Sequence, residues 1–307
     1  MHLASRFLSP TAPPTSHLPP NTFRKMDFPK IAVLGAGTMG SGIVTVALMA
    51  GRQVVMVDIA DAALAKGRSA IEKNLEKARE KGRLTEEIPA ILARLTTATE
   101  YAAIGDCSLV IEAVSENPVV KGKVFELISK NAGDDAVIVS NTSALKISTF
   151  AEKYKKPERV LGMHFFNPPV VLKLVELVQT PKCDPAVFAK ARAFVESIGK
   201  EPVVVKESPG FIVNRILIPV INEAACIFGE GVASAADIDT AMKSGAAHPI
   251  GPLALGDLVG LDVCLAIMQT LQEIDPVKFK PAPALEALVK AGKLGRKSGE
   301  GFFSYAK

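Results

Sequence analysis

A glycine-rich turn joins a short apolar segment to a helical segment near residue 35. Residues 30–34 are apolar and predict a strand, the turn reads Gly35-Ala36-Gly37-Thr38-Met39-Gly40, and residues 41–50 predict a helix. In such a turn the first glycine allows the tight bend, the second lets a pyrophosphate approach the backbone, and the third permits close packing of helix on strand. A second strand follows at 53–57 and ends in Asp58. This order of elements predicts a dinucleotide-binding unit rather than an ordinary cluster of loop glycines.

Asp58 favours NAD over NADP as the cofactor. A carboxylate at this position accepts hydrogen bonds from both hydroxyls of an adenosine ribose. The 2′-phosphate of NADP would be repelled by it, and residues 59–61 contain no arginine to offset the repulsion. The residues of this unit expected to bind the cofactor are Gly35, Gly37, Thr38, Met39, Gly40 and Asp58.

Strands and helices alternate along the first two thirds of the chain. Further strands are predicted near 95–99, 108–114, 136–140 and 160–164, and helices over 61–82 and 85–94. The fold class expected is therefore an α/β Rossmann-type domain with a mostly parallel sheet. From about residue 207 helical periodicity takes over, at 210–229, 234–244, 253–271 and 282–292. A smaller all-α C-terminal domain is expected there, so that the folded chain divides into 28–207, with a helical hairpin at 61–94, and 208–307.

Polar residues follow three of the predicted strands, where ligands of such sheets bind. Glu112 and Glu116 come after one strand, Ser140-Asn141-Thr142-Ser143 after the next, and His164 after a third. Each has an ordinary alternative: a serine can cap a helix, a glutamate can be solvated, and a histidine can be a core residue.

His164 and Glu176 form a candidate acid–base pair. Histidine titrates near neutral pH, and a carboxylate on one ring nitrogen fixes the tautomer and stabilises the protonated ring, as oxidation of an alcohol requires. Asn214 stands within an apolar stretch that opens the helical domain, where its amide can bond a substrate oxygen or fill a core position.

Composition excludes several other classes of protein. The formal charge is +4, with basic residues spread along the chain, so no nucleic-acid partner is expected. No apolar run approaches the roughly 20 residues that span a bilayer, so no membrane partner is expected either. The four cysteines lack metal-ligand spacing, and we predict no metal site.

Residues 1–27 differ from the rest of the chain. They contain five prolines, and no acidic residue precedes Asp27. We expect a disordered extension; a weak transit peptide is the alternative, and Met26 is an alternative start of translation.

Seven phrases together identify a resemblance over residues 28–307. They are GAGTMGSGI at 35–43, EAVSEN at 112–117, SNTS at 140–143, GMHFFNP at 162–168, KLVE at 173–176, PGFIVNRIL at 209–217 and HPIGPLALGDLVGLD at 248–262. The chain resembles the L-3-hydroxyacyl-CoA dehydrogenases, most closely their short single-function branch acting on 3-hydroxybutyryl-CoA. The resemblance implies reversible NAD-dependent oxidation of an (S)-3-hydroxyacyl-CoA to the 3-ketoacyl-CoA. It also implies a homodimer formed through the C-terminal domain and a cytoplasmic location, or a mitochondrial one if residues 1–27 are a transit peptide.

Site residues follow from the resemblance by position. It implies that His164 is the catalytic base with Glu176 as its partner, and that Ser143 and Asn214 bond the reacting oxygen. Beside the cofactor it places Glu116, Lys121, Ser143 and Asn167, and beside the acyl-CoA substrate Ser143, Asn167, Asn214 and Lys81. Lys66, Lys73 and Lys77 lie on the same predicted hairpin as Lys81 and suit CoA phosphates, although a solvated helix face explains them equally well.

The sequence departs from the family pattern at two places. Asn167-Pro168-Pro169-Val170 replaces the usual Asn-Pro-Val-Pro, and Ser115 stands where an aliphatic residue is common. Neither change removes a chemical group, but the shifted proline leaves the acyl-chain preference open. The alternatives are a dehydrogenase of the same build acting on a non-CoA hydroxy acid such as a sugar acid, and an NAD-binding relative without catalytic activity.

Overall fold

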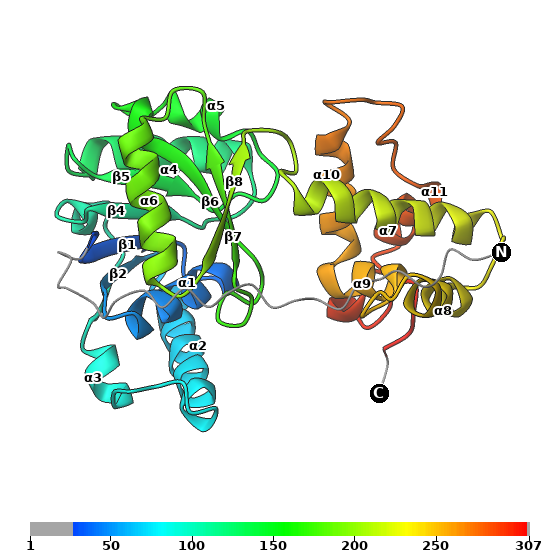
Figure 1. The fold of residues 1–307 in the computed structure, drawn as a ribbon, viewed down its shortest axis with the longest axis horizontal. Coiled ribbons are helices and arrows are strands. Elements are labelled where there is room, and N and C mark those ends of the chain that lie inside the picture. Colours follow the sequence, from blue (N-terminus) through cyan, green and yellow to red (C-terminus); the bar gives the residue numbers. More distant parts are fainter. Residues whose placement is uncertain (1–26, 306–307) are drawn as a thin grey trace, which may run out of the picture.

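The computed structural model describes residues 27–305 of the chain. It consists of a sheet-containing part and a helical part that lie side by side (Figure 1). The extension predicted at 1–27 falls, except for Asp27, outside the described residues.

Eight strands form one sheet in the order β3-β2-β1-β4-β5-β6-β7-β8. The first six are parallel, β7 runs antiparallel to β6, and β8 runs parallel to β7. Their bounds are β1 Lys30–Leu34, β2 Gln53–Val57, β3 Leu95–Ala98, β4 Leu109–Glu112, β5 Val137–Ser140, β6 Val160–Phe165, β7 Leu174–Gln179 and β8 Glu201–Lys206. The chain order of the strands reverses between β1 and β4, and a dinucleotide-binding sheet holds its ligand at such a point.

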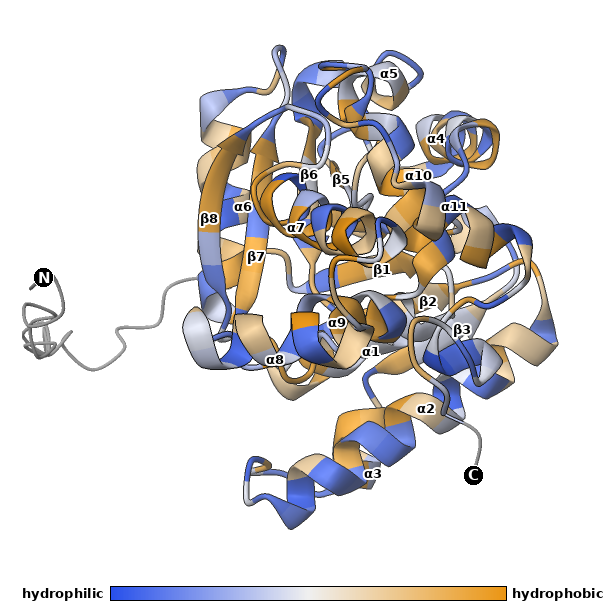
Figure 2. Ribbon diagram, turned by 90° about the vertical axis from the view of Figure 1, so that its right-hand side faces the viewer, coloured by the Kyte–Doolittle hydropathy of each residue, from blue (hydrophilic) through white to orange (hydrophobic). Residues whose placement is uncertain are grey.

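Helices cover both faces of this sheet, as the alternation of strands and helices predicts. Alternate strand residues pack on α1, α2, α3 and α6 on one face, and on α4, α5 and the 3₁₀ turn η1 on the other. The bounds are α1 Thr38–Met49, α2 Asp61–Glu80, α3 Ile88–Leu92, η1 Tyr101–Ile104, α4 Pro118–Asn131, α5 Ile147–Ala151 and α6 Pro185–Ser197. Apolar residues dominate the strands, whereas α2 is mixed and projects from the rest of the fold (Figure 2).

The C-terminal part is built from five helices around a separate core of buried aliphatic side chains. They are α7 Val213–Gly229, α8 Ala235–Gly245, α9 Pro252–Val259, α10 Leu261–Leu271 and α11 Pro283–Lys290. The predicted fold class, a mostly parallel Rossmann-type sheet followed by a smaller helical domain, is confirmed.

One prediction about an individual element is wrong. Residues 253–271, predicted as one helix, form two helices bent by 98° at Gly260, whose φ of +105° is rare for residues other than glycine. Strands β7 and β8 were not predicted from the sequence.

Within residues 27–305, no single helix is long and apolar enough to cross a membrane. Only the bent pair α9 and α10 passes that test, and only when its two halves are taken together.

Candidate active site

The glycine turn between β1 and α1 leaves space where a phosphate would lie. A Cβ on Gly35, whose φ is +102°, would lie 2.6 Å from the carbonyl oxygen of Ala113, and a Cβ on Gly40 would collide with the carbonyl group of Gly35. A Cβ on Gly37 would meet no atom within 4 Å. No side chain caps the start of α1, and its first turn carries no acidic residue. The outer two glycines therefore serve the fold, and the open middle one and the uncapped helix end fit a pyrophosphate.

Asp58 lies at the mouth of a cavity of about 340 Å³ beside this turn. Its Oδ2 accepts a hydrogen bond of 2.8 Å from the backbone N–H of Ala36, which fixes the carboxylate toward the glycine turn. Tyr101 and the exposed Ile59 also line the cavity. Burial, followed by the charges of Asp58 and Glu112, raises the pKa of Tyr101. A carboxylate placed in this way fits the adenosine ribose of a dinucleotide.

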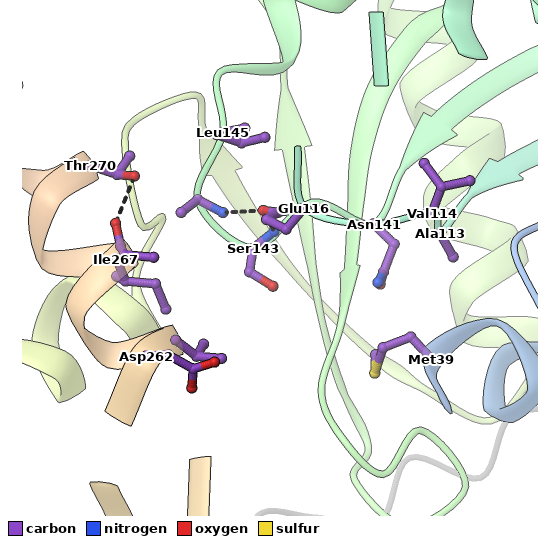
Figure 3. A pocket seen from close by; sticks show the side chains of 13 residues that line it. Met39, Ala113, Val114, Glu116, Asn141, Ser143, Leu145, Asp262, Ile267 and Thr270 are labelled. Atoms are coloured by element: carbon purple, nitrogen blue, oxygen red, sulfur yellow. Dashed lines mark hydrogen bonds between the residues drawn. The ribbon is translucent and has the colours of Figure 1, made fainter. Parts of the chain in front are cut away.

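A second cavity, of about 400 Å³, lies between the sheet and the helical domain. Met39, Glu116, Asn141 and Ser143 line it from the sheet side. Asp262, Ile267 and Thr270 of α10 face these residues across the cavity (Figure 3). The two cavities adjoin along Ala113 and Val114, which line both, so one extended ligand can occupy them together.

His164 and Glu176 are directly opposed on β6 and β7. They are register partners of the antiparallel pair, and His164 Nδ1 lies 2.8 Å from Glu176 Oε2. Both side chains are buried, with relative exposures of 5% and 1%. His164 Nε2 makes no hydrogen bond to any residue in the range 27–305. The geometry is that of a general base whose tautomer is fixed by a carboxylate.

The second oxygen of Glu176 binds the helical domain. Oε1 accepts hydrogen bonds of 3.0 Å from the backbone N–H groups of Ile212 and Val213, at the start of α7. Helix N-termini leave such N–H groups unsatisfied, and Ile212 has no capping side chain of its own. Phe211, just before the helix, packs its ring 5.6 Å from the His164 ring. One carboxylate thus orients the histidine and caps the first helix of the other domain.

Ser143 and Asn214 are in contact across the domain boundary. The Asn214 amide donates a hydrogen bond of 3.1 Å to the backbone oxygen of Ser143. Asn141, two residues earlier, accepts a hydrogen bond of 2.9 Å from the backbone N–H of Phe165, next to His164. The loops after β5 and β6 and the start of α7 are therefore joined around one cleft.

Glu116 and Lys121 are also linked to this cleft, but in different ways. Glu116 lines the cavity, and its Oε1 accepts hydrogen bonds from Thr142 Oγ1 and the backbone of Ser143. Lys121 lines neither cavity: its side chain is 1% exposed, and its ammonium lies 2.7 Å from Glu112 and 3.2 Å from Glu116.

Asn167 and Lys81 are not drawn into these contacts. Asn167 is exposed and makes no side-chain hydrogen bond within residues 27–305. Its loop is held by buried Lys200, which donates to the backbone oxygens of Pro169 and Leu172 at 2.5 and 2.8 Å. Lys81 follows the last turn of α2 and is exposed, as are Lys66, Lys73 and Lys77 on the side of that helix away from its buried stripe.

Sequence reasoning missed part of the cleft. Asn141 and the α10 residues were not predicted as site residues, and Glu112 was noted only as a polar strand end. Glu112 ends an otherwise apolar strand, and a buried charge needs a partner, so its position carried a usable signal. The α10 residues were not singled out, because a helix face of mixed apolar and polar residues looks the same in the sequence whether it meets a cleft or solvent. No cluster of three metal-ligating side chains occurs among the described residues.

Comparisons with known proteins agree over the whole folded region. The family described as "3-hydroxyacyl-CoA dehydrogenase, NAD binding domain" matches residues 30–208, and "3-hydroxyacyl-CoA dehydrogenase, C-terminal domain" matches residues 210–305. The 3-hydroxybutyryl-CoA dehydrogenase of Clostridioides difficile is 45% identical over 280 residues, which are 91% of this chain and 100% of that protein. The mitochondrial hydroxyacyl-coenzyme A dehydrogenase of Rattus norvegicus is 40% identical, over 92% of this chain and 93% of the relative.

A solved structure shows the same fold. The (S)-3-hydroxybutyryl-CoA dehydrogenase of Ralstonia eutropha matches with a TM-score of 0.87 and 44% identity, over 91% of this chain and 100% of that one. The fold of this chain is therefore that of an established class of enzyme. The chain belongs to the 3-hydroxyacyl-CoA dehydrogenase family, whose members are NAD-dependent oxidoreductases.

Proposed function

We propose that the protein interconverts (S)-3-hydroxyacyl-CoA and 3-ketoacyl-CoA, with short acyl chains such as 3-hydroxybutyryl-CoA as substrates. The observation that carries the proposal is the His164–Glu176 pair near the carboxyl end of β6, in which Glu176 binds Nδ1 and Nε2 has no hydrogen-bond partner among residues 27–305. The names of the 41–45% identical relatives support the short-chain substrate. A non-CoA hydroxy acid is the less favoured substrate.

The residues that would hold NAD are those of the glycine turn and its surroundings. The start of α1, with Gly37, Thr38 and Met39, would bind the pyrophosphate, and Asp58 the adenosine ribose. Glu116 and Ser143 would flank the nicotinamide end, with Asn167 reaching it from the loop after β6. When bound, NAD supplies the acceptor for the hydride that leaves C3 of the substrate.

His164 removes the proton of the 3-hydroxyl group through Nε2. The ring then carries a positive charge, which Glu176 stabilises through Nδ1. Ser143 and Asn214 hold the substrate oxygen, so that they orient the alcohol and polarise the ketone in the reverse direction. The 5% exposure of His164 keeps water away from the base and favours proton exchange with the substrate alone.

The CoA part of the substrate would lie toward α2. The exposed lysines of that helix share one side of it, and Lys81 stands at its end, so their charges suit the CoA phosphates. Lys81→Ala is expected to raise the KM for acetoacetyl-CoA while leaving the KM for NADH unchanged. An equal rise in both values would argue against this placement.

A homodimer would use the outer face of α7. Ile216 is 65% exposed on this helix, and an apolar groove of about 440 Å³ runs between α7 and α8, lined by Val220, Ile227 and Met242. Ile216→Glu is expected to shift the protein from dimer to monomer in light scattering, and a dimer that survives the change would exclude this face.

We place the protein in the cytoplasm, or in mitochondria if residues 1–27 direct it there, as the name of the rat relative suggests.

Oxidation of NADH at 340 nm tests the function directly. We expect turnover with acetoacetyl-CoA and a decline with longer 3-ketoacyl-CoA esters. Sugar acids with NAD should give no signal. Turnover of a sugar acid without activity on acetoacetyl-CoA would favour the non-CoA alternative, and inactivity with all substrates would favour a non-catalytic relative.

A further inference from the structure

A buried chain of three charged groups lies beneath the cleft. Glu112 ends β4, Lys121 lies in the second turn of α4, and Glu116 lies in the loop between them. Glu112 and Lys121 are buried, whereas the Glu116 side chain is 42% exposed toward the cavity. Burying an ammonium and a carboxylate is costly unless each is paired and fully hydrogen-bonded, so these partners must satisfy one another.

The inner end of this chain is saturated with hydrogen bonds. Glu112 Oε1 accepts from Lys121 Nζ at 2.7 Å and from the backbone N–H of Val114 at 2.8 Å. Its Oε2 accepts from Ser140 Oγ at 2.5 Å. Glu112 and Ser140 are register partners at the ends of β4 and β5. The inner carboxylate is thus fixed to both central strands.

The ammonium of Lys121 contacts three oxygens. It donates hydrogen bonds to Glu112 Oε1 and to the backbone oxygen of Val114, the latter at 3.4 Å, and it forms an ion pair with Glu116 Oε2 at 3.2 Å. The Lys121 side chain is 1% exposed and lines neither cavity. These contacts tie the start of α4 to the end of β4 and to Glu116.

The outer end of the chain holds the loop that carries Ser143. Glu116 Oε1 accepts from Thr142 Oγ1 at 2.6 Å, from the backbone N–H of Ser143 at 2.8 Å and from that of Ala144 at 3.3 Å. A half-exposed glutamate on a loop samples several rotamers unless its other oxygen is held, and here Lys121 holds it.

We propose that Glu112 and Lys121 are positioning residues that act on the reaction through Glu116 and Ser143. The proposal rests on the function proposed above. A misplacement of about 1 Å at a reacting group costs on the order of 100-fold in rate. Loosening the Glu116–Ser143 contact is therefore expected to lower kcat, while the pyrophosphate and ribose contacts keep the KM for NADH unchanged.

The test uses the full-length enzyme with acetoacetyl-CoA and NADH. The variant Glu112→Gln/Lys121→Met removes both buried charges together, so that neither is left unpaired. We expect kcat to fall about tenfold, with the KM for NADH within a factor of about three. Lys123→Met is the matched control, because Lys123 is exposed on the same helix and its kcat should remain that of the wild type.

A second readout separates positioning from general weakening of the fold. If the buried pair acts through Ser143, adding it to Ser143→Ala should cost no more than Ser143→Ala alone. If the fold-losses in kcat of Ser143→Ala and of the buried-pair variant multiply in full when combined, the proposal is overturned. A raised KM for NADH at unchanged kcat would also overturn it. If Ser143→Ala keeps the kcat of the wild type, the role of Ser143 and the positioning chain fail together, while activity of the wild type would still support the proposed reaction.

Ser140→Ala keeps the proposal testable if the double variant does not fold. It removes the hydroxyl group that donates to Glu112 Oε2 and also accepts a hydrogen bond of 3.3 Å from the backbone N–H of Thr142. We expect a fall in kcat of about threefold and the same non-additivity with Ser143→Ala. A kcat equal to that of the wild type would contradict the proposal.

Discussion

The sheet domain and the helical domain both bury carboxylates, but they use them differently. Among residues 27–305, the helical-domain Asp257 accepts hydrogen bonds only from Phe302, Phe303 and Tyr305, and Asp239 only from the start of α9. In the sheet domain Glu176 faces His164, and Glu112 faces Lys121. Burial of a charge is therefore no sign of function by itself. What separates the two domains is the partner of the carboxylate. In the sheet domain it is a histidine or lysine beside the cleft, whereas in the helical domain it is backbone N–H groups and, for Asp257, the Tyr305 hydroxyl.

Removal of the base His164 should lower activity the most while leaving stability nearly unchanged. His164→Gln is expected to lower kcat by about 10² to 10⁴, because a positioned acid–base group contributes that much. NAD binding, measured by calorimetry, and the free energy of unfolding should stay near those of the wild type. Near-normal turnover in this variant would remove His164 from the proposed mechanism.

The preference for NADH over NADPH should depend on the carboxylate of Asp58. We expect kcat/KM with NADPH to be roughly 100-fold below that with NADH, because the 2′-phosphate would face Asp58. Asp58→Ala should narrow this ratio, whereas Asp61→Ala, three residues further on and exposed, should leave it unchanged. Comparable rates of the wild type with both cofactors would contradict the role assigned to Asp58.

Loss of a buried carboxylate in the helical domain should lower the stability of the protein and leave its activity unchanged. Asp257→Asn replaces one of the two acceptor oxygens with an NH2 group, which would face at least one backbone N–H group and cannot accept its hydrogen bond. The free energy of unfolding is expected to fall by about 3 kcal/mol, with kcat per folded molecule unchanged. Urea denaturation and active-site titration measure the two quantities, with the exposed Glu273→Gln as control. A fall in kcat without loss of stability would break the contrast between the domains.

High pH should weaken the helical domain slightly through Cys264. Burial raises the pKa of its thiol from 9.0 to about 12. Between these two values the thiol ionises only in the unfolded chain, so its contribution is complete below pH 9 and is lost as the pH rises toward 12. From pH 8 to pH 10 the wild type should lose about 1 kcal/mol more than Cys264→Ala in urea denaturation. Equal losses would show that the thiol ionises alike in both states.

Local signals made part of this structure predictable from the sequence. The glycine turn, the strand before it and Asp58 lie within 30 residues of one another, and each has its own chemical requirement. The ends of β5 and β6 were predictable because apolar runs stop at polar residues there. The pairing of His164 with Glu176 was predicted, but its geometry was not, because it depends on the antiparallel register of β6 and β7, and β7 was not predicted as a strand.

Other features depend on contacts between distant segments. The bend at Gly260 has no local signal beyond one glycine in an apolar run, and its direction is set by how α9 and α10 pack on α7. The contacts of Lys121 join α4 to the end of β4 and to the loop that follows it, so a lysine in an amphipathic helix gave no hint of them. The resemblance placed Lys121 beside the cofactor but indicated none of these contacts.

The shared carboxylate of Glu176 limits how this enzyme can be taken apart. A sheet domain produced without α7 would retain the NAD-binding turn, yet Glu176 would lose its two N–H donors and its buried surroundings. In a chimaera that joins this sheet domain to a foreign substrate domain, the first helix would have to begin at the same place to complete the dyad. The domains can thus differ in what they bind, but they are not interchangeable modules, because the base is complete only when both are present.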